Sequence, residues 1–253
     1  MRAERHARLL DVPTTDRVLL GVLTPSSNTR LEPLTGAMLR DLPEVTAHFS
    51  RFRVVDVGLD AVSQFALDPI LEAASLLADA RVDAIVWSGT SGAWLGVDAD
   101  RHLCAAIRDA TGIPATTSTL ALLDALARSG VTSLGLITPY PDDMHATVVR
   151  TLTAMGAPVT VSRNHAVTLS NWELSAIPGD ALTALVAEVA SESPAAITTF
   201  CTNLVAAPLV PQWEAQWDIP VYDSISLGVW RVLELAGVDA TRVRGWGRLF
   251  DLA

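Results

Sequence analysis

A cysteine ends an apolar, β-branched stretch in the second half of the chain. Residues 195–200 read Ala-Ala-Ile-Thr-Thr-Phe, and Cys201, Thr202 and Asn203 follow. Such a run is typical of a buried strand of a parallel sheet, and open α/β folds bind ligands at the carboxyl edge of that sheet. A thiol placed there can give or take a proton. We expect Thr202 to cap a following helix whose free N–H groups favour the thiolate. The alternative is a buried structural cysteine.

Three other buried runs, residues 17–24, 82–88 and 133–138, also end in polar turns. These turns carry hydroxyl, amide and phenol groups, which can donate hydrogen bonds to a ligand. Gly89 lets the backbone come close to a ligand. The alternatives are that Thr90 and Ser91 only cap a helix, and that Asn28 and Tyr140 are turn residues that pack. The polar turns at the strand ends contain Pro25, Asn28, Gly89, Thr90, Ser91 and Tyr140, together with Thr202 and Asn203.

Strands and helices alternate along the chain, which predicts parallel sheets and an α/β fold. Helical patterns follow the strand-like runs throughout; they cover residues 69–80, 98–111, 118–129, 143–154, 180–190 and 224–236. The two halves also match each other. Residues 23–25 match 137–139 at a spacing of 114, residues 83–91 match 195–203 at 112, and residues 112–114 match 218–220 at 106. Three matches in the same order indicate a duplicated domain.

The duplication predicts two pseudo-symmetric, Rossmann-like lobes with the active site in the cleft between them. We expect residues 1–115 plus 223–253 to form the first lobe and residues 116–222 the second. Gly89 is then the counterpart of Cys201. A cleft with room for two thiols therefore carries one thiol and one glycine.

Composition excludes several classes of protein. The chain has 253 residues, half of them hydrophobic, and a formal charge of −10, which argues against nucleic acid and anionic membranes as partners. No apolar run reaches the roughly 18 residues of a membrane span, and the charged start does not resemble a signal peptide. Two cysteines and scattered histidines make neither a disulfide framework nor a metal site. We expect a cytoplasmic protein without cofactor or metal, with a homo-oligomer possible.

Five segments in order resemble the aspartate/glutamate racemase superfamily, and most of all its maleate isomerase and arylmalonate decarboxylase branch. The resemblance covers about residues 17 to 250; its motifs are Pro25-Ser26-Ser27-Asn28-Thr29, Gly89-Thr90-Ser91-Gly92, Thr138-Pro139-Tyr140, Cys201-Thr202-Asn203 and Gly245-Trp246-Gly247-Arg248-Leu249. It implies a cofactor-independent enzyme that acts, through an enediolate, at the carbon next to a carboxylate. Racemases and isomerases of this superfamily use two cysteines, whereas the decarboxylases have Gly-Thr-Ser in the first half and one cysteine in the second.

The resemblance therefore implies a decarboxylase-like enzyme with Cys201 as its single catalytic cysteine. It also implies a set of residues that bind substrate: Pro25, Asn28, Gly89, Thr90, Ser91, Tyr140, Asn171, Thr202 and Asn203. The first turn departs from the decarboxylases, because its asparagine, Asn28, matches the isomerases; a second isomerase asparagine falls on Asn171. The substrate stays open among a four-carbon diacid, an aryl malonate and an amino-acid derivative. A maleate isomerase or an aspartate/glutamate racemase is the first alternative, and a protein that only binds a small carboxylate is the second.

Other candidate residues carry weaker signals. Cys104 lies in a helical pattern and is predicted to be structural. Trp94 and Trp172 lie near the motifs and either line an apolar pocket or pack in the core. A hydrolase with Cys201 as nucleophile needs a histidine within hydrogen-bond reach, and the sequence places none there. His145, which follows Tyr140 closely, is a candidate for the edge of the cleft.

Overall fold

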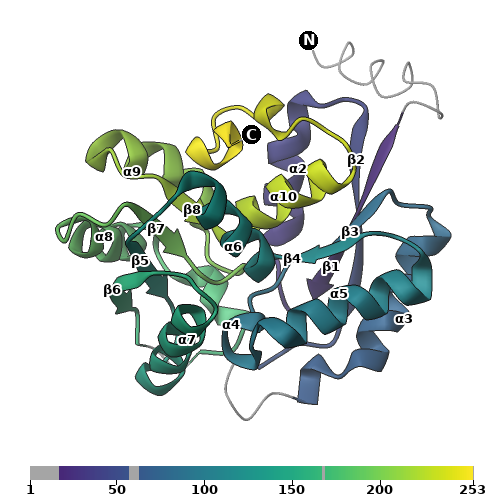
Figure 1. The fold of residues 1–253 in the computed structure, drawn as a ribbon, viewed down its shortest axis with the longest axis horizontal. Coiled ribbons are helices and arrows are strands. Elements are labelled where there is room, and N and C mark those ends of the chain that lie inside the picture. Colours follow the sequence, from purple (N-terminus) through teal and green to yellow (C-terminus); the bar gives the residue numbers. More distant parts are fainter. Residues whose placement is uncertain (1–16, 57–62, 167–168, 253) are drawn as a thin grey trace.

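Two four-stranded parallel sheets form the centre of the computed structural model, which describes residues 17–56, 63–166 and 169–252 (Figure 1). The first sheet has the order β2-β1-β3-β4, and the second has the order β6-β5-β7-β8. The strands are β1 (Val18–Pro25), β2 (Val45–Phe52), β3 (Ala84–Trp87), β4 (Ala115–Thr117), β5 (Leu134–Thr138), β6 (Val159–Asn164), β7 (Ala196–Thr199) and β8 (Val221–Asp223). The second sheet thus repeats the strand order of the first, which confirms the predicted α/β fold with two matching parallel sheets.

Helices connect nearly all of these strands. The α-helices are α2 (Leu31–Met38), α3 (Leu67–Asp79), α4 (Gly92–Leu95), α5 (Val97–Thr111), α6 (Ser118–Ser129), α7 (Asp142–Ala154), α8 (Gly179–Ala190), α9 (Val210–Trp217) and α10 (Ser224–Leu235). Short 3-10 turns are η2 (Leu39–Asp41), η4 (Glu173–Ala176), η5 (Ala207–Leu209), η6 (Ala240–Arg242) and η7 (Arg248–Asp251). Within the described ranges, no helix combines the length and apolarity needed to cross a bilayer.

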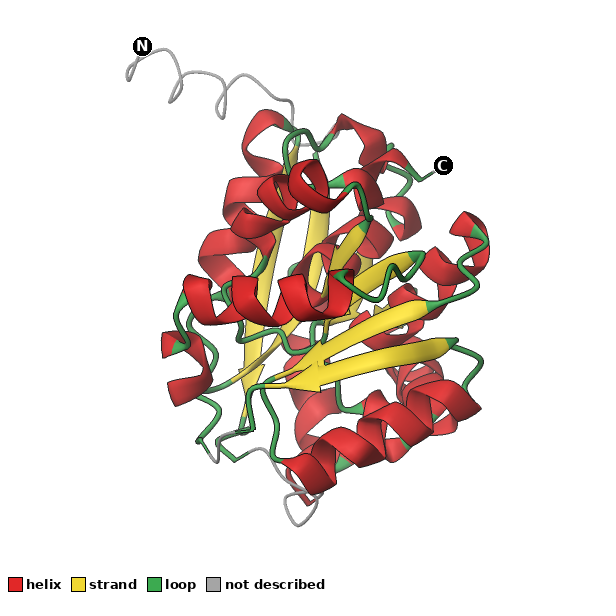
Figure 2. Ribbon diagram, turned by 90° about the vertical axis from the view of Figure 1, so that its left-hand side faces the viewer, coloured by secondary structure: helices red, strands yellow, loops and turns green. Residues whose placement is uncertain are grey.

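The helices cover both faces of the first sheet. On one face, α3 and α5 enclose a core built around Leu23, Ile85 and Ile107. On the other face lie α2, α6 and α10, and the buried side chains there belong to one core that continues into the second sheet. Figure 2 shows the strands of the two sheets running at an angle to each other, with helices packed around both. One continuous core therefore fixes the two sheets relative to each other.

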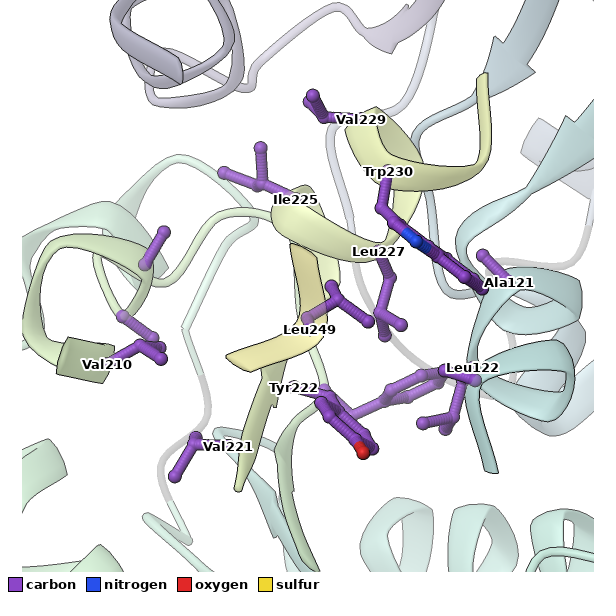
Figure 3. Close-up of a cluster of buried hydrophobic side chains, with 14 of the residues drawn as sticks. Ala121, Leu122, Val210, Val221, Tyr222, Ile225, Leu227, Val229, Trp230 and Leu249 are labelled. Carbon is purple, nitrogen blue, oxygen red and sulfur yellow. The ribbon is translucent and has the colours of Figure 1, made fainter. Parts of the chain in front are cut away.

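The last long helix returns to the first sheet. α10 follows β8 of the second sheet, yet it packs against β3, β4, α2 and α6. Figure 3 shows the contact, where Trp230 and Leu227 of α10 lie beside Ala121 and Leu122 of α6, close to Tyr222 of β8. Because these side chains are almost wholly buried, they remove a large apolar area from water. This packing holds the carboxyl ends of the two sheets together.

Side-chain caps fix the start of the helix after β4 and of the helix after β8. The hydroxyl of Thr117 accepts a hydrogen bond from the N–H of Leu120 at the start of α6, at 3.0 Å. The carboxylate of Asp223 accepts from the N–H groups of Ile225 and Ser226 at the start of α10, at 2.9 and 3.0 Å. Thr117 and Asp223 occupy matching positions of the repeat, so the same junction is built with two different side chains.

Candidate active site

A small cavity lies where the carboxyl ends of the strands of both sheets meet. Its volume is about 30 Å³. The lining comes from the ends of β1 and β3, the turns after β3, β5 and β7, helix α4, and the segments after β2 and β6; it consists of Pro25, Val54, Phe65, Trp87, Gly89, Thr90, Ser91, Trp94, Tyr140, Asn171, Cys201 and Thr202. Gly89 and Cys201, which we expected to face one cleft, both line it. Eight of the ten residues singled out in the sequence are thus brought together here.

The thiol of Cys201 is buried in this cavity, with 4% of the residue exposed. Burial raises the pKa of the thiol above its usual value, although N–H groups of Asn203 and Leu204 and the phenol of Tyr140 donate hydrogen bonds to the sulfur and lower that pKa. Burial is the largest effect, so the thiol is held in its protonated form at neutral pH. This overturns the expectation that the surroundings favour a thiolate.

The helix expected at Thr202 is not present. Residues 202–206 form turns, and regular structure resumes at η5 and α9. Pro208 lies in the first turn of η5 and Pro211 in the first turn of α9. Proline is tolerated in a first turn but breaks a helix interior, so one helix cannot run from Thr202 through both prolines. Backbone N–H groups of a turn, rather than of a helix end, contact the sulfur.

Tyr140 and Thr90 connect the two halves beside the thiol. The phenol oxygen of Tyr140 lies 3.2 Å from the hydroxyl of Thr90, within hydrogen-bond distance. Burial raises the pKa of Tyr140 well above its usual value, so the phenol remains a hydrogen-bond donor. Ser91, next to Thr90, accepts a hydrogen bond from the indole N–H of Trp87 at 3.1 Å. Hydroxyl groups of Thr90, Ser91, Tyr140 and Thr202 therefore line the same cavity as the sulfur.

Trp87 occupies the space in which a side chain at Gly89 would lie. A Cβ atom added to Gly89 would come within 2.2 Å of the Trp87 ring. The ring is almost wholly buried and packs against Phe52, with 4.7 Å between ring centroids. Sequence reasoning missed Trp87. The repeat contained a signal, because this bulky ring stands where the second half has Thr199, two residues before the glycine.

Four residues tie the wall of the cavity to its surroundings. The side-chain amide of Asn28 donates to the carbonyl oxygen of Thr202 at 3.0 Å, and its oxygen accepts from the N–H groups of Arg30 and Leu31. Asn171 donates to the hydroxyl of Ser27 at 2.8 Å, and Asn203 donates to the carbonyl oxygen of Asn171. Asn171 and Thr202 line the cavity, whereas Asn28 and Asn203 lie buried behind its wall.

Aromatic rings form the apolar side of the cavity. Trp94 lies edge-on to Tyr140, with 5.8 Å between ring centroids, and Phe65 packs against Trp94 at 6.0 Å. Trp94 therefore belongs to the wall, as one of the two interpretations of this residue predicts. Trp172 does not line the cavity and is 59% exposed.

The described side chains of the lining are all uncharged at neutral pH. The two ring nitrogens of His145 form hydrogen bonds with the hydroxyls of Thr138 and Ser162, at 2.8 and 3.0 Å, and His145 does not line the cavity. In the described parts of the chain, no three His, Cys, Asp or Glu side chains are grouped in a way that could hold a metal ion. A bound carboxylate would be held by neutral hydrogen-bond donors alone.

Comparison with known proteins places this site in a family. The family model described as arylmalonate decarboxylase matches residues 30–250. The arylmalonate decarboxylase of Bordetella bronchiseptica is 28% identical over 238 residues, which covers 92% of this chain and 96% of that protein. A maleate isomerase of Nocardia farcinica is 28% identical over 243 residues, with coverage of 91% and 94%.

Solved structures of the same branch share the fold. The maleate isomerase Iso from Pseudomonas putida S16, in a cysteine-to-alanine variant with maleate, superposes with a TM-score of 0.85 and is 25% identical. The match covers 93% of this chain and 98% of that one. The relatives are thus similar to this chain over nearly their whole length, and both enzyme types suggested by the motifs are among them.

Proposed function

We propose a reaction for this chain, which belongs to the arylmalonate decarboxylase family: cofactor-independent decarboxylation of a substituted malonate, with the thiol of Cys201 as the proton donor. One carboxylate of the substrate leaves as CO₂. The electron pair of the broken carbon–carbon bond passes to the α-carbon and spreads onto the second carboxylate as an enediolate. The thiol proton then moves to the α-carbon, and the thiolate regains a proton from water.

The observation that carries this proposal is a single thiol in a cavity lined by uncharged polar and aromatic side chains. Burial raises the pKa of Cys201, so the sulfur begins as the acid that the enediolate needs. A reaction that starts with attack by this sulfur would need the thiolate instead. The hydrogen bonds from two backbone N–H groups and Tyr140 then stabilise the thiolate that proton transfer leaves behind.

The neutral polar groups of the cavity supply the rest of the mechanism. We assign the hydroxyls of Thr90 and Ser91 to the second carboxylate, where charge accumulates as CO₂ leaves, because the single O–H of Tyr140 is donated to the sulfur. The apolar rings support the loss of CO₂, because a carboxylate held away from water is destabilised relative to neutral CO₂. Asn28 and Asn203 act as positioning residues, since they hold Thr202 and Asn171 without lining the cavity.

We also propose the lobe division 1–115 plus 223–253 and 116–222, with the cleft between the lobes. The packing of α10 against the first sheet supports the return of the C-terminal segment. The two cysteines are free thiols, which supports a reducing compartment such as the cytoplasm.

A screen of malonates for CO₂ release tests the function. The purified protein should release CO₂ from at least one substituted malonate. When the α-carbon carries two different substituents, the product should be of one hand, since the thiol reaches one face only. In deuterated water the α-carbon should carry one deuterium. A protein that releases no CO₂ from any malonate is not the proposed decarboxylase.

A maleate isomerase is the second candidate, because maleate isomerases are among the similar proteins and Asn28 matches their first turn. Maleate added to the same screen separates the two, since conversion to fumarate without CO₂ release would favour the isomerase. Against it stands the glycine at position 89, where the superfamily's first cysteine belongs. Trp87 leaves no room there for a second sulfur.

A further inference from the structure

The cavity that contains the thiol of Cys201, which we call the reacting cavity, is much smaller than the usual binding site of an organic ligand. Its volume of about 30 Å³ compares with roughly 300–1,000 Å³ for drug-sized ligands and about 10–15 Å³ for one water molecule. A substituted malonate must therefore displace part of the lining when it binds, and a phenyl substituent must displace more of it than a methyl group. The rings of Phe65, Trp87, Trp94 and Tyr140 pack on one another along its apolar side, so the wall is supported from behind.

A second cavity also borders Trp87. It has a volume of about 140 Å³ and shares Phe65, Trp87 and Ser91 with the reacting cavity. We call it the side pocket; the rest of its lining is mostly apolar and comprises Leu67, Ile70, Leu95, Ala99, Asp100, His102 and Leu103. An apolar cavity of about 150 Å³ can hold benzene. The side pocket thus has the size that the reacting cavity lacks.

The Trp87 indole forms the partition between the two cavities. Its ring packs against Phe52, its N–H donates to Ser91, and the missing side chain of Gly89 leaves the space that it fills. Because Trp87 borders both cavities, a smaller side chain at this position would join them.

We propose that Trp87 sets the size of the substrate's α-substituent by closing the reacting cavity off from the side pocket. With Trp87 in place, the enzyme accepts malonates with substituents about the size of a methyl group and rejects aryl groups. With a smaller residue at position 87, the side pocket becomes the subsite for an aryl group. This inference rests on the proposed function, because it names the substrate class of the same site.

Binding measured without turnover tests the size rule separately from the reaction. In a Cys201→Ala background, calorimetry compares the Kd of methylmalonate with that of phenylmalonate. The protein with Trp87 should prefer methylmalonate by at least about tenfold. Trp87→Leu should reverse this preference or reduce it by about tenfold or more. Fully burying an apolar group of this kind contributes about 1.5–3 kcal/mol to the binding free energy, which corresponds to a change of about 10–150-fold in Kd.

Leu67→Ala is the matched control, because Leu67 lines the side pocket without touching the reacting cavity. It enlarges the side pocket but leaves the partition, so the ratio of the two Kd values should stay as in the parent protein. If Trp87→Leu does not fold, Trp87→Phe, which removes only part of the ring, should give a smaller shift in the same direction.

Indole is a second probe that needs no carboxylate. It should raise the Tm of Trp87→Ala, whose cavity it refills, and leave the Tm of the wild type unchanged. Equal binding of methylmalonate and phenylmalonate by the protein with Trp87, or an unchanged ratio in Trp87→Leu, overturns the size rule. The correct size ranking without any CO₂ release by the wild type overturns the proposed reaction alone. Failure of every protein to bind either diacid overturns both.

Discussion

The turn after β3 and the turn after β7 occupy matching places in two sheets of the same strand order, yet they present different groups to one cavity. The second turn presents the thiol of Cys201, with backbone N–H groups directed at the sulfur. The first turn presents Gly89, and Trp87 fills the space beside it. The comparison shows that one turn supplies the thiol of the cavity, whereas the matching turn leaves the space for a ring that shapes the cavity.

The largest effect should come from removing the thiol. Cys201→Ala should lower kcat by about 10³-fold or more, since proton transfer by a positioned side chain contributes roughly 10²–10⁴-fold. Cys104→Ala is the matched control. Cys104 is half-buried on α5, its pKa is raised to about 12 by burial, and it does not line the cavity. Equal losses in the two variants, measured as CO₂ release, would remove Cys201 from the mechanism.

Adding a side chain at Gly89 should lower the unfolding free energy of the protein. Gly89→Ala places a Cβ against the Trp87 ring, and such overpacking costs about 1–3 kcal/mol or more. In a Trp87→Leu background the same substitution should cost much less. A double-mutant cycle of unfolding free energies in urea should therefore give a coupling of at least about 1 kcal/mol. Additive effects would show that the ring does not restrict position 89.

Trp87 and Gly89 also illustrate what could be predicted from the sequence. The alternation of strands and helices and the three spaced matches predicted two parallel sheets, because burial patterns repeat locally along the chain. The turns at the strand ends could be identified for the same reason. Trp87 was missed because its role depends on a clash in three dimensions with the absent side chain of Gly89.

The prediction of a helix that begins at Thr202 was wrong for a local reason. Thr202 is a suitable cap residue, but Pro208 and Pro211 farther along the chain decide where a helix can begin. The sign of the pKa shift of Cys201 was also beyond the sequence, because it depends on how completely the sulfur is buried. The contact of Asn203 with Asn171, 32 residues away, is likewise a property of the folded chain.

A smaller effect should follow from loss of one hydroxyl in the first turn. Thr90→Ala should lower kcat by roughly 10²-fold, the scale for removing one donor to a developing oxyanion. Tyr140→Phe should act similarly, and the double variant should lose less than the product of the two, because the two groups are within hydrogen-bond distance of each other. Thr153→Ala, an exposed hydroxyl on α7, is the control and should leave kcat unchanged.

The smallest expected effect concerns the buried aspartates at the matching strand-to-helix junctions. In the first half, Thr117 caps the helix and donates to Asp100, whereas in the second half Asp223 is the cap itself. Burial raises the pKa of both carboxyls from 3.8 to about 6. Between pH 7 and pH 5 the folded protein takes up protons at these sites and the unfolded chain does not. The unfolding free energy should therefore rise on acidification, by about 1 kcal/mol per site, and fall again as the pH rises through 6.

Removing one site distinguishes the two junctions. Asp100→Asn should gain only about half as much stability between pH 7 and pH 5 as the wild type, because Asp223 alone then takes up a proton. Asp109→Asn, an exposed position on the same helix α5, should leave the pH response as it is. Urea unfolding at the two pH values measures all three proteins. If Asp100→Asn gains as much as the wild type, Asp100 is ionised in the folded protein at pH 5, and the two junctions differ in charge as well as in the residue that caps the helix.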